Sequence, residues 1–289
     1  MIPPSFAYHA PGSVDDAIAL LSQYGDAAKI LAGGHSLLPM MKLRFAEPEH
    51  LVDLKNIDAL KGIREENGEI VIGSMTTENE LIASALLAEK CPMLPEAARM
   101  IADPQVRNRG TIGGDISHGD PGNDHPALML ALDATFTLVG PNGSRQIAAS
   151  DFFLGTFFTA LEADEILTGV RLAPQAANTG ASYQKLKRKT GDYATAAAAV
   201  VISLSGETCQ SANIALTNLG ATAMRASAAE TALVGQVIDE DLINQAAVKA
   251  MEICDPAEDL RGDAEYKTHM GGEMTRRAIR AAIQRAGGN

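Results

Sequence analysis

Cysteine is scarce in this sequence, and its placement argues against metal centres. The three cysteines among 289 residues are Cys91, Cys209 and Cys254. They form no CxxC pair and no Cys/His cluster, which argues against zinc or iron–sulfur ligation within the chain. Three thiols without a disulfide pattern are typical of a reducing compartment, and the opening MIPPSFAYHA lacks the basic and apolar segments of a signal peptide. We therefore expect a cytoplasmic protein with no metal site of its own.

Positive charge and long apolar runs are also in short supply. The formal net charge is −12, which argues against nucleic acid as a partner. The longest apolar stretch, YATAAAAVVISL, falls short of the ~18 residues that read as a membrane span, so no such span is expected. Residues 1–175 hold 12 Lys and Arg against 23 Asp and Glu, a net charge of −11. A phosphate bound there must be attracted by local backbone dipoles rather than by bulk charge.

The length of the chain predicts two domains, because single domains commonly hold ~100–200 residues. The apolar content of 46% is typical of a globular protein with an adequate core. The stretch PQAANTGA, residues 174–181, has the composition of a linker. We therefore place one domain over residues 1–176 and the second over 177–289.

Periodicity and turn residues predict a mixture of helices and strands. The stretch SVDDAIALLSQYG combines a Ser cap, an apolar stripe and a closing Gly, and predicts a helix over 13–25. Pro-Asn-Gly predicts the turn of a hairpin over 134–149. Further helices are predicted at 37–43, 76–84, 91–102, 227–235, 241–254 and up to 286, and further strands at 29–34, 50–54, 69–75, 165–172, 183–189, 196–204 and 210–220.

One long stretch, residues 107–126, is expected to be irregular. It reads RNRGTIGGDISHGDPGNDHP, with five glycines and few apolar residues. The apolar segment ALMLALDATF that follows reads as a helix and then a strand, so both ends of the stretch are anchored. Long irregular segments inside compact domains are usually functional or disordered. We favour function.

Two glycine-rich turns are the main candidates for ligand binding. They are AGGHS (32–36), between a predicted strand and a predicted helix, and GTIGGD (110–115), inside the long loop. Paired glycines let backbone N–H groups approach a ligand closely, and Ser36 and Thr111 can donate a hydroxyl to a phosphate oxygen. Neither turn is GxGxxG or a P-loop. One glycine pair alone is most simply a tight turn, whereas two together favour a diphosphate.

Polar residues near these turns have two possible roles. Asp124 precedes a predicted helix, so it can be an N-cap, a carboxylate that accepts ribose hydroxyls, or both. His35 and His118 flank the turns without a Ser or Cys nucleophile partner, so we expect them to contact ligand or to be structural rather than to act as general bases. No catalytic constellation is predicted.

The stretch KLKRKTGDYATA, residues 185–196 of the second domain, combines alternating cations with an aromatic ring. It can be an amphipathic edge strand with Lys187 and Lys189 in solvent. Alternatively, Lys185 lies near an anionic or electron-rich ring position of a ligand, and Tyr193 stacks beside that ring. The residues alone leave both readings open.

The motifs together resemble a known family. AGGHSLLPMMKLR, ADPQVRNRGTIGGD, GDPGNDHPALM and YQKLKRKTGDYATAAAAVV are similar to the FAD-binding medium subunits of the xanthine dehydrogenase family of molybdenum hydroxylases, within the aerobic carbon monoxide dehydrogenase branch. The resemblance covers essentially the whole chain. It implies an α+β protein: a vanillyl-alcohol-oxidase-like FAD-binding domain of two α/β subdomains, about 1–55 and 56–176, and an α+β C-terminal domain with a small antiparallel sheet and helices.

The resemblance also implies a cofactor, FAD, and a set of contacts to it. The diphosphate is expected at Ala32–Ser36 and Thr111–Asp115, Asp124 on the ribose side, and Lys185 and Tyr193 near the isoalloxazine ring. Many relatives have Asn where this chain has Asp115, which makes a direct role of that carboxylate doubtful beside a diphosphate. The full expected set is Ala32, Gly33, Gly34, His35, Ser36, Leu37, Ala102, Val106, Gly110, Thr111, Gly113, Gly114, Asp115, His118, Asp124, Leu161, Leu167, Lys185 and Tyr193.

The same resemblance implies a division of labour among subunits. Electrons pass from a molybdenum-cofactor large subunit, through two [2Fe–2S] clusters of a small subunit, to FAD here and then to an external acceptor, for example a peripheral membrane carrier. A dimer of heterotrimers is expected. The alternatives are the medium subunit of a related aldehyde or heterocycle hydroxylase, a self-contained flavin oxidase or dehydrogenase, and an assembly module that has lost FAD.

Overall fold

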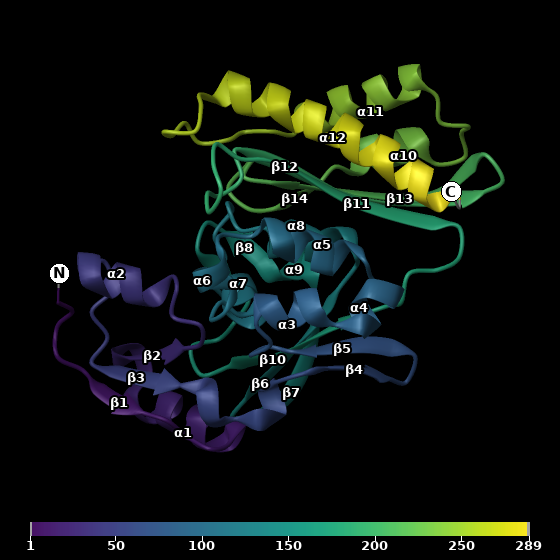
Figure 1. Cartoon of the computed structure of the whole chain (residues 1–289). Helices are drawn as coiled ribbons and strands as arrows, with labels where there is room; N and C mark the ends of the chain where they lie inside the picture. The colour runs from purple at the N-terminus through teal and green to yellow at the C-terminus, as the bar shows by residue number, and fades with distance from the viewer. Residues whose placement is uncertain (1, 288–289) are drawn as a thin grey trace.

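The N-terminal part of the chain folds around a small parallel sheet. The computed structural model describes residues 2–287 (Figure 1). The first elements are β1 (Ala7–His9), α1 (Val14–Tyr24), β2 (Ala28–Leu31), α2 (Leu37–Leu43) and β3 (His50–Asp53). Helix α1 forms as predicted, because the Ser13 hydroxyl accepts a hydrogen bond from the Asp16 N–H at 3.1 Å and an apolar stripe is buried. The strand order is β1-β3-β2, so β2 delivers the AGGHS turn at one edge of the sheet.

A second sheet of five antiparallel strands follows. Its order is β4-β5-β10-β6-β7, with β4 (Ile63–Glu66), β5 (Glu69–Gly73), β6 (Thr135–Gly140), β7 (Gly143–Ala148) and β10 (Ile166–Leu172). The predicted Pro-Asn-Gly hairpin is confirmed, since Gly140 pairs with Gly143 across the turn. Strand β10 joins the sheet between β5 and β6, and thereby ties residues near 170 to those near 70.

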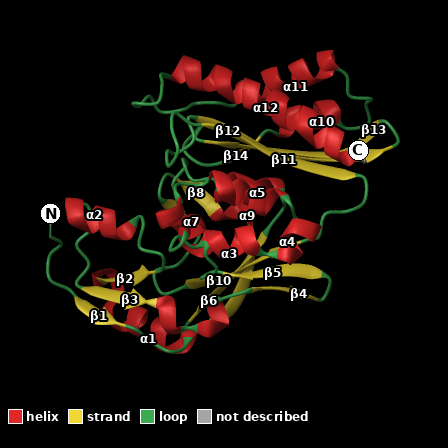
Figure 2. Cartoon of the chain, in the orientation of Figure 1, coloured by secondary structure: helices red, strands yellow, loops and turns green. Residues whose placement is uncertain are grey.

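Helices cover one face of this sheet and separate it from a third sheet (Figure 2). They are α3 (Glu78–Ala83), α4 (Ala85–Lys90), α5 (Met93–Met100), α6 (Pro104–Arg107), α7 (Ile112–His118), α8 (His125–Ala131) and α9 (Ala149–Phe152), with the short hairpin β8 (Phe153–Gly155) and β9 (Phe158–Thr159) beside them. One hydrophobic core includes Ile72 of β5, Leu128 of α8 and Ala199 of the third sheet. This continuity holds the middle and last parts of the chain together.

The C-terminal part is an antiparallel sheet with helices on its outer face (Figure 1). Its elements are β11 (Thr179–Leu186), β12 (Ala196–Ser205), β13 (Thr208–Thr217), β14 (Met224–Arg225), α10 (Ser227–Leu233), α11 (Glu240–Met251) and α12 (Ala264–Ala286). The alanine-rich β12 is buried on both faces, and small side chains allow α12 and α8 to approach it. Strand β11 lies at the edge of the sheet, beside α5 of the preceding region.

The observed fold confirms the expected α+β class and corrects three local predictions. The stretch 107–126 is not irregular, because α7 occupies its middle. The helix predicted at 91–102 ends early, because α5 stops at Met100 and Pro104 begins the separate helix α6. The expected linker 174–181 is shorter than predicted, since β11 already starts at Thr179. Within residues 2–287, no helix has the length and apolar character needed to cross a bilayer.

Candidate functional site

The two glycine turns lie against each other, backbone to backbone. A Cβ atom on Gly33 would collide with the Arg109 carbonyl oxygen and would lie 2.8 Å from the Cα of Gly110. On the other side of the contact, a Cβ on Gly114 would lie 3.5 Å from the Cβ of Ala32. Only residues without side chains permit this approach. Segments almost eighty residues apart in the sequence therefore form one continuous backbone surface.

Each turn opens a helix, which corrects the expectation that GTIGGD lies in a loop. The Thr111 hydroxyl caps α7 by accepting a hydrogen bond from the Gly114 N–H at 3.2 Å. Ser36 occupies the equivalent position before α2, but its side chain makes no capping bond, and Leu37 is the first helical residue. Gly34 has a φ of +80°, which glycine adopts without strain. The first N–H groups of α7 already have acceptors, since Ile112 donates to the Thr76 carbonyl oxygen at 3.0 Å and Gly113 to that of Ser74. The open N–H groups that a helix start offers a ligand are therefore sought at the AGGHS turn before α2.

The GTIGGD turn is anchored to the end of β5. The Gly113 N–H donates to the Ser74 carbonyl oxygen at 2.9 Å, and a Cβ on Gly113 would lie 2.6 Å from that same oxygen. The Gly110 carbonyl oxygen accepts from the Glu78 N–H at 3.1 Å. These bonds to a central strand and to α3 hold the turn rigidly, as a preorganised binding surface requires.

Asp124 connects the middle region to the C-terminal sheet. Its carboxylate accepts a hydrogen bond from the Tyr183 hydroxyl at 2.5 Å and an ion-paired one from Lys185 Nζ at 2.7 Å. Both side chains of the ion pair are almost fully buried. Asp124 stands at the N-cap position of α8 but makes no capping bond, so the capping role expected from the sequence is not observed. Burial, and then the Asp124 carboxylate, raise the pKa of Tyr183, which keeps its hydroxyl protonated.

Asp115, at the end of the GTIGGD turn, belongs to a second group of polar side chains, together with Glu78 and His125. Burial raises the pKa of Asp115 to about 8, and its Oδ1 is enclosed without a hydrogen-bond partner among residues 2–287. His125 Nε2 lies 2.9 Å from a Glu78 carboxylate oxygen. Burial works to lower the pKa of His125, but the Glu78 carboxylate outweighs it and raises that pKa to about 9. Asp115 therefore stays largely neutral at pH 7, which removes the repulsion expected between a carboxylate and a diphosphate.

The segment between α5 and α7 contacts the GTIGGD turn. Ala102 has a φ of +43°, a strained value for a residue with a Cβ. The Val106 carbonyl oxygen, in α6, accepts a hydrogen bond from the Gly110 N–H at 2.6 Å. Strain of this kind persists only where surrounding contacts enforce it, and such positions cluster at binding sites.

The remaining residues expected at the site differ in how far they are exposed to solvent. His35 is exposed, whereas the His118 ring lies 5.0 Å from that of Phe157. Leu161 is half-buried and Leu167 is buried in the core, where its side chain has little access to solvent. Tyr193 is 43% exposed and packs beside the backbone of the loop before α8, with the Arg261 guanidinium 5.3 Å from its ring centre.

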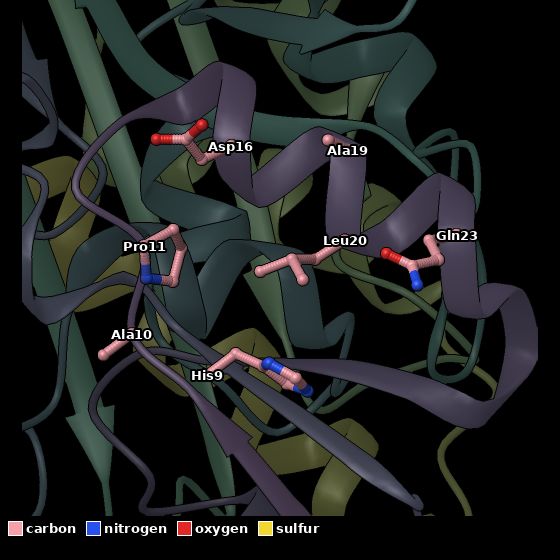
Figure 3. A pocket seen from close by; sticks show the side chains of 7 residues that line it. All are labelled: His9, Ala10, Pro11, Asp16, Ala19, Leu20 and Gln23. Carbon is pink, nitrogen blue, oxygen red and sulfur yellow. The ribbon is translucent and has the colours of Figure 1, made fainter.

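A cavity beside α1 lies away from the glycine turns (Figure 3). It has a volume of about 430 Å³ and is lined by His9, Ala10, Pro11, Asp16, Ala19, Leu20 and Gln23. None of these residues belongs to the glycine turns, and the cavity offers only one carboxylate and one imidazole to a ligand. The described part of the chain holds no group of three His, Cys, Asp or Glu side chains arranged to bind a metal ion.

Three residues at the site escaped the sequence reasoning. Tyr183 shares a face of β11 with Lys185, as the period of two in a strand requires, and this spacing is the signal that could have indicated it. In the sequence, Glu78 and His125 are polar residues near helix starts and carry no sign of a functional role. Their pairing joins positions 47 residues apart, and no local pattern reveals it.

Comparison with known proteins places the chain in a family. Residues 4–175 match the family model described as FAD binding domain in molybdopterin dehydrogenase, and residues 181–282 match the CO dehydrogenase flavoprotein C-terminal domain. The carbon monoxide dehydrogenase medium chain of Hydrogenophaga pseudoflava is 58% identical over 285 residues, covering 99% of both chains. The 6-hydroxypseudooxynicotine dehydrogenase complex subunit alpha of Paenarthrobacter nicotinovorans is 36% identical, covering 99% of this chain and 97% of its own.

A solved structure extends the likeness to three dimensions. The carbon monoxide dehydrogenase from Hydrogenophaga pseudoflava that lacks the Mo-pyranopterin moiety of the molybdenum cofactor matches with a TM-score of 0.98 and 60% identity, over 99% of each chain. The sequence matches and this structural match cover both regions of the chain. The chain therefore belongs to the family of FAD-binding medium subunits of molybdenum hydroxylases, in its carbon monoxide dehydrogenase branch.

Proposed function

We propose that this chain is the electron-transfer flavoprotein of a molybdenum hydroxylase that oxidises carbon monoxide. It takes electrons from the [2Fe–2S] clusters of a partner subunit and passes them to an external acceptor. The observation that carries this proposal is the contact between the two glycine turns, where Gly33 meets Gly110. It sets the AGGHS turn at the start of α2 directly against the start of α7, in a part of the chain whose net charge is −11. Local dipoles supply the positive potential that a diphosphate requires.

The residues present suit FAD. A Cβ atom at Gly33 would collide with the Arg109 carbonyl group, so the two turns form one backbone surface only because glycine occurs there. We propose that Ala32–Ser36 and Thr111–Asp115 hold the diphosphate. Asp124 lies on the ribose side, since a carboxylate can accept about four hydrogen bonds and only two come from Tyr183 and Lys185.

The chain's own residues position and insulate the cofactor. FAD supplies the redox chemistry when bound: uptake of two electrons and one proton leaves one additional negative charge on its ring system. Leu161, Leu167, Lys185 and Tyr193 are proposed to border the ring. With the chain divided into 1–176 and 177–289, Leu161 and Leu167 lie before the boundary and Lys185 and Tyr193 after it, and β11 carries Lys185.

The metal centres are proposed to lie on partner chains. A large subunit would hold the molybdenum cofactor and a small subunit two [2Fe–2S] clusters, with two such heterotrimers in the assembly. The scattered cysteines agree with this division, because thiolate ligands for clusters are needed in groups. A cytoplasmic location and a membrane-associated acceptor remain predictions that cell fractionation tests.

Purification from the native cell tests the proposal. An affinity tag on this chain should bring down one larger and one smaller chain, with molybdenum, iron and a flavin absorption spectrum. The complex should reduce an artificial acceptor with carbon monoxide faster than with aldehydes. A colourless preparation, still empty after incubation with FAD, would exclude the flavoprotein function.

The same experiment separates the competing functions. The 36% identical relative belongs to a dehydrogenase complex for a nicotine-derived heterocycle, so a preference for a heterocycle or an aldehyde over carbon monoxide would assign the chain to a related hydroxylase. Turnover of a small organic substrate by the isolated, flavin-containing chain would favour a self-contained oxidase instead.

A further inference from the structure

Lys185 in β11 and Lys187 just after this strand both reach the last residue of α5. Lys187 Nζ donates a hydrogen bond to the Met100 carbonyl oxygen at 2.9 Å, and Lys185 Nζ lies 3.4 Å from the same oxygen. The two side chains share a face because they are two residues apart in extended chain. Of the two lysines that one sequence reading placed in solvent, Lys189 is exposed, whereas Lys187 is half-buried and bonded to Met100.

Arg107 adds a third cation at the next two carbonyl groups. Its Nη1 donates to the Ile101 carbonyl oxygen at 2.8 Å and to that of Ala102 at 3.3 Å. Its Nε is buried and has no acceptor among residues 2–287. Three consecutive carbonyl groups, beginning at Met100, therefore face cationic side chains, and one guanidinium N–H is left unpartnered.

Only one of these cations is neutralised. Lys185 forms its ion pair with Asp124. Lys187 and Arg107 form no ion pair with any carboxylate of the described chain, although the surrounding region is strongly acidic. Burial, followed by repulsion from Lys185 and Arg107, lowers the pKa of Lys187, while the attraction of Asp124 opposes that shift. The two charges are thus held together and partly desolvated without a counter-ion.

These cations lie next to the proposed FAD site. The strained turn at Ala102 leads into α6, in which the Val106 carbonyl oxygen accepts a hydrogen bond from Gly110 of the diphosphate cradle. Of the two ends of a dinucleotide, adenine does not change charge in the reaction. Lys185, which is proposed to border the ring, lies against the same carbonyl oxygen as Lys187. The diphosphate keeps its charge throughout, whereas the ring system would gain a negative charge on reduction, so cations on this side would stabilise the reduced ring relative to the oxidised one.

We propose that Lys187 and Arg107, rather than Lys185, supply the uncompensated positive charge that stabilises the reduced form of the bound flavin. This inference rests on the proposed function. When bound, FAD would take up two electrons from the reductant and one proton from solvent, and Lys187 and Arg107 would stabilise the negative charge that this leaves on the ring system. Lys187 and Arg107 act as tuning residues, since their side chains bond to backbone carbonyl groups rather than to reacting atoms.

The test is a measurement of the flavin midpoint potential in the holoenzyme, by anaerobic titration against a reference dye. Lys187→Gln should lower the potential by ~30 mV, which corresponds to about a tenfold fall in the equilibrium constant for two-electron reduction. Lys187→Arg keeps the charge and should restore the potential. Lys189→Gln removes an exposed charge from the same stretch and should leave it unchanged, because solvent screens that charge.

The outcomes separate this inference from the proposed function. A parent complex without FAD would overturn the proposed function itself. FAD-loaded Lys187→Gln and Arg107→Gln variants with the parental potential would overturn the tuning role while leaving the flavoprotein intact. Loss of FAD from Lys187→Gln, with the cofactor retained by Lys187→Arg, would assign Lys187 to cofactor binding and likewise overturn tuning.

Discussion

Gly33 shows how a single residue controls the candidate site. Its missing side chain lets the AGGHS turn touch the Arg109 carbonyl group, so the reason for glycine is the close approach of a second backbone segment. The sequence indicated that two glycine turns act together, but it placed the second in a loop. A helix start could not be recognised there, because the apolar contacts of α7 with β10 are tertiary and its glycines lower helix propensity.

Gly33→Val should abolish FAD retention in the holoenzyme. The added side chain would displace one glycine turn from the other and block the backbone N–H groups from the diphosphate. The measurement is the ratio of flavin to protein absorbance after gel filtration. Gly12→Val is the matched control, since a side chain there meets nothing within 4 Å. A Gly33→Val protein that kept stoichiometric flavin would show that this turn does not hold the diphosphate.

Asp115 should make the stability of the chain depend on pH. Its pKa is raised from 3.8 to about 8 in the folded state, so the unfolded carboxyl ionises first and stability falls as pH rises toward 8. His125 adds to the loss, because stability gained from its raised pKa is full below 6.5 and disappears as pH rises through about 9. Both groups therefore act in the same direction between pH 6.5 and 8.

Asp115→Asn separates the two contributions. The amide stays neutral, so the melting temperature of the variant should fall less than that of the parent between pH 6.5 and 8, by about 2–4 °C for each kcal/mol removed. The remaining slope then reports His125. Equal slopes in the two proteins would mean that Asp115 is already ionised in the folded chain at pH 6.5.

At the scale of elements, α8 and β11 are joined by a buried ion pair. The sequence identified Asp124 and Lys185 as candidates separately, one for ribose and one for the ring. Their direct bond spans 61 residues and could not be predicted from local pattern. The strand period correctly put Lys185 and Lys187 on one face, but only the packing of β11 against α5 decides that this face is buried.

Asp124→Asn should destabilise the chain by about 3–5 kcal/mol, because it leaves Lys185 charged and unpaired in the interior. The double variant Asp124→Asn, Lys185→Met should recover part of that loss, since it removes the orphaned charge. Chemical denaturation of all four members of the cycle measures the coupling. Glu240→Gln, which breaks the exposed pair with Arg280, serves as the control and should change stability by less than about 1 kcal/mol. Additive effects of the two buried substitutions would refute a direct interaction.

At the scale of the whole molecule, the two predicted domains share one interior. The hydrophobic core that begins at β5 continues to β12, and polar bonds cross the same boundary: Arg285 to Glu96 at 2.8 Å, and Asn213 Nδ2 to the Ala131 carbonyl oxygen at 2.9 Å. Length and linker composition indicated a division near residue 176 but carried no information about this contact surface. A helix layer shared by two sheets is a property of packing, not of local sequence.

The full chain should therefore unfold in one cooperative transition despite its two-domain sequence pattern. Separation of the two parts near residue 176 would expose apolar core surface and leave Asp124, Lys185 and Tyr183 without their partners. Unfolding of one part alone is therefore unfavourable. Scanning calorimetry should show a single peak whose van't Hoff and calorimetric enthalpies agree. Asp124→Asn breaks the buried ion pair, so the C-terminal sheet should unfold separately from the rest and the peak should split into two. Glu240→Gln should leave a single peak. Two resolved transitions in the parent would show that the shared core contributes too little to couple the domains.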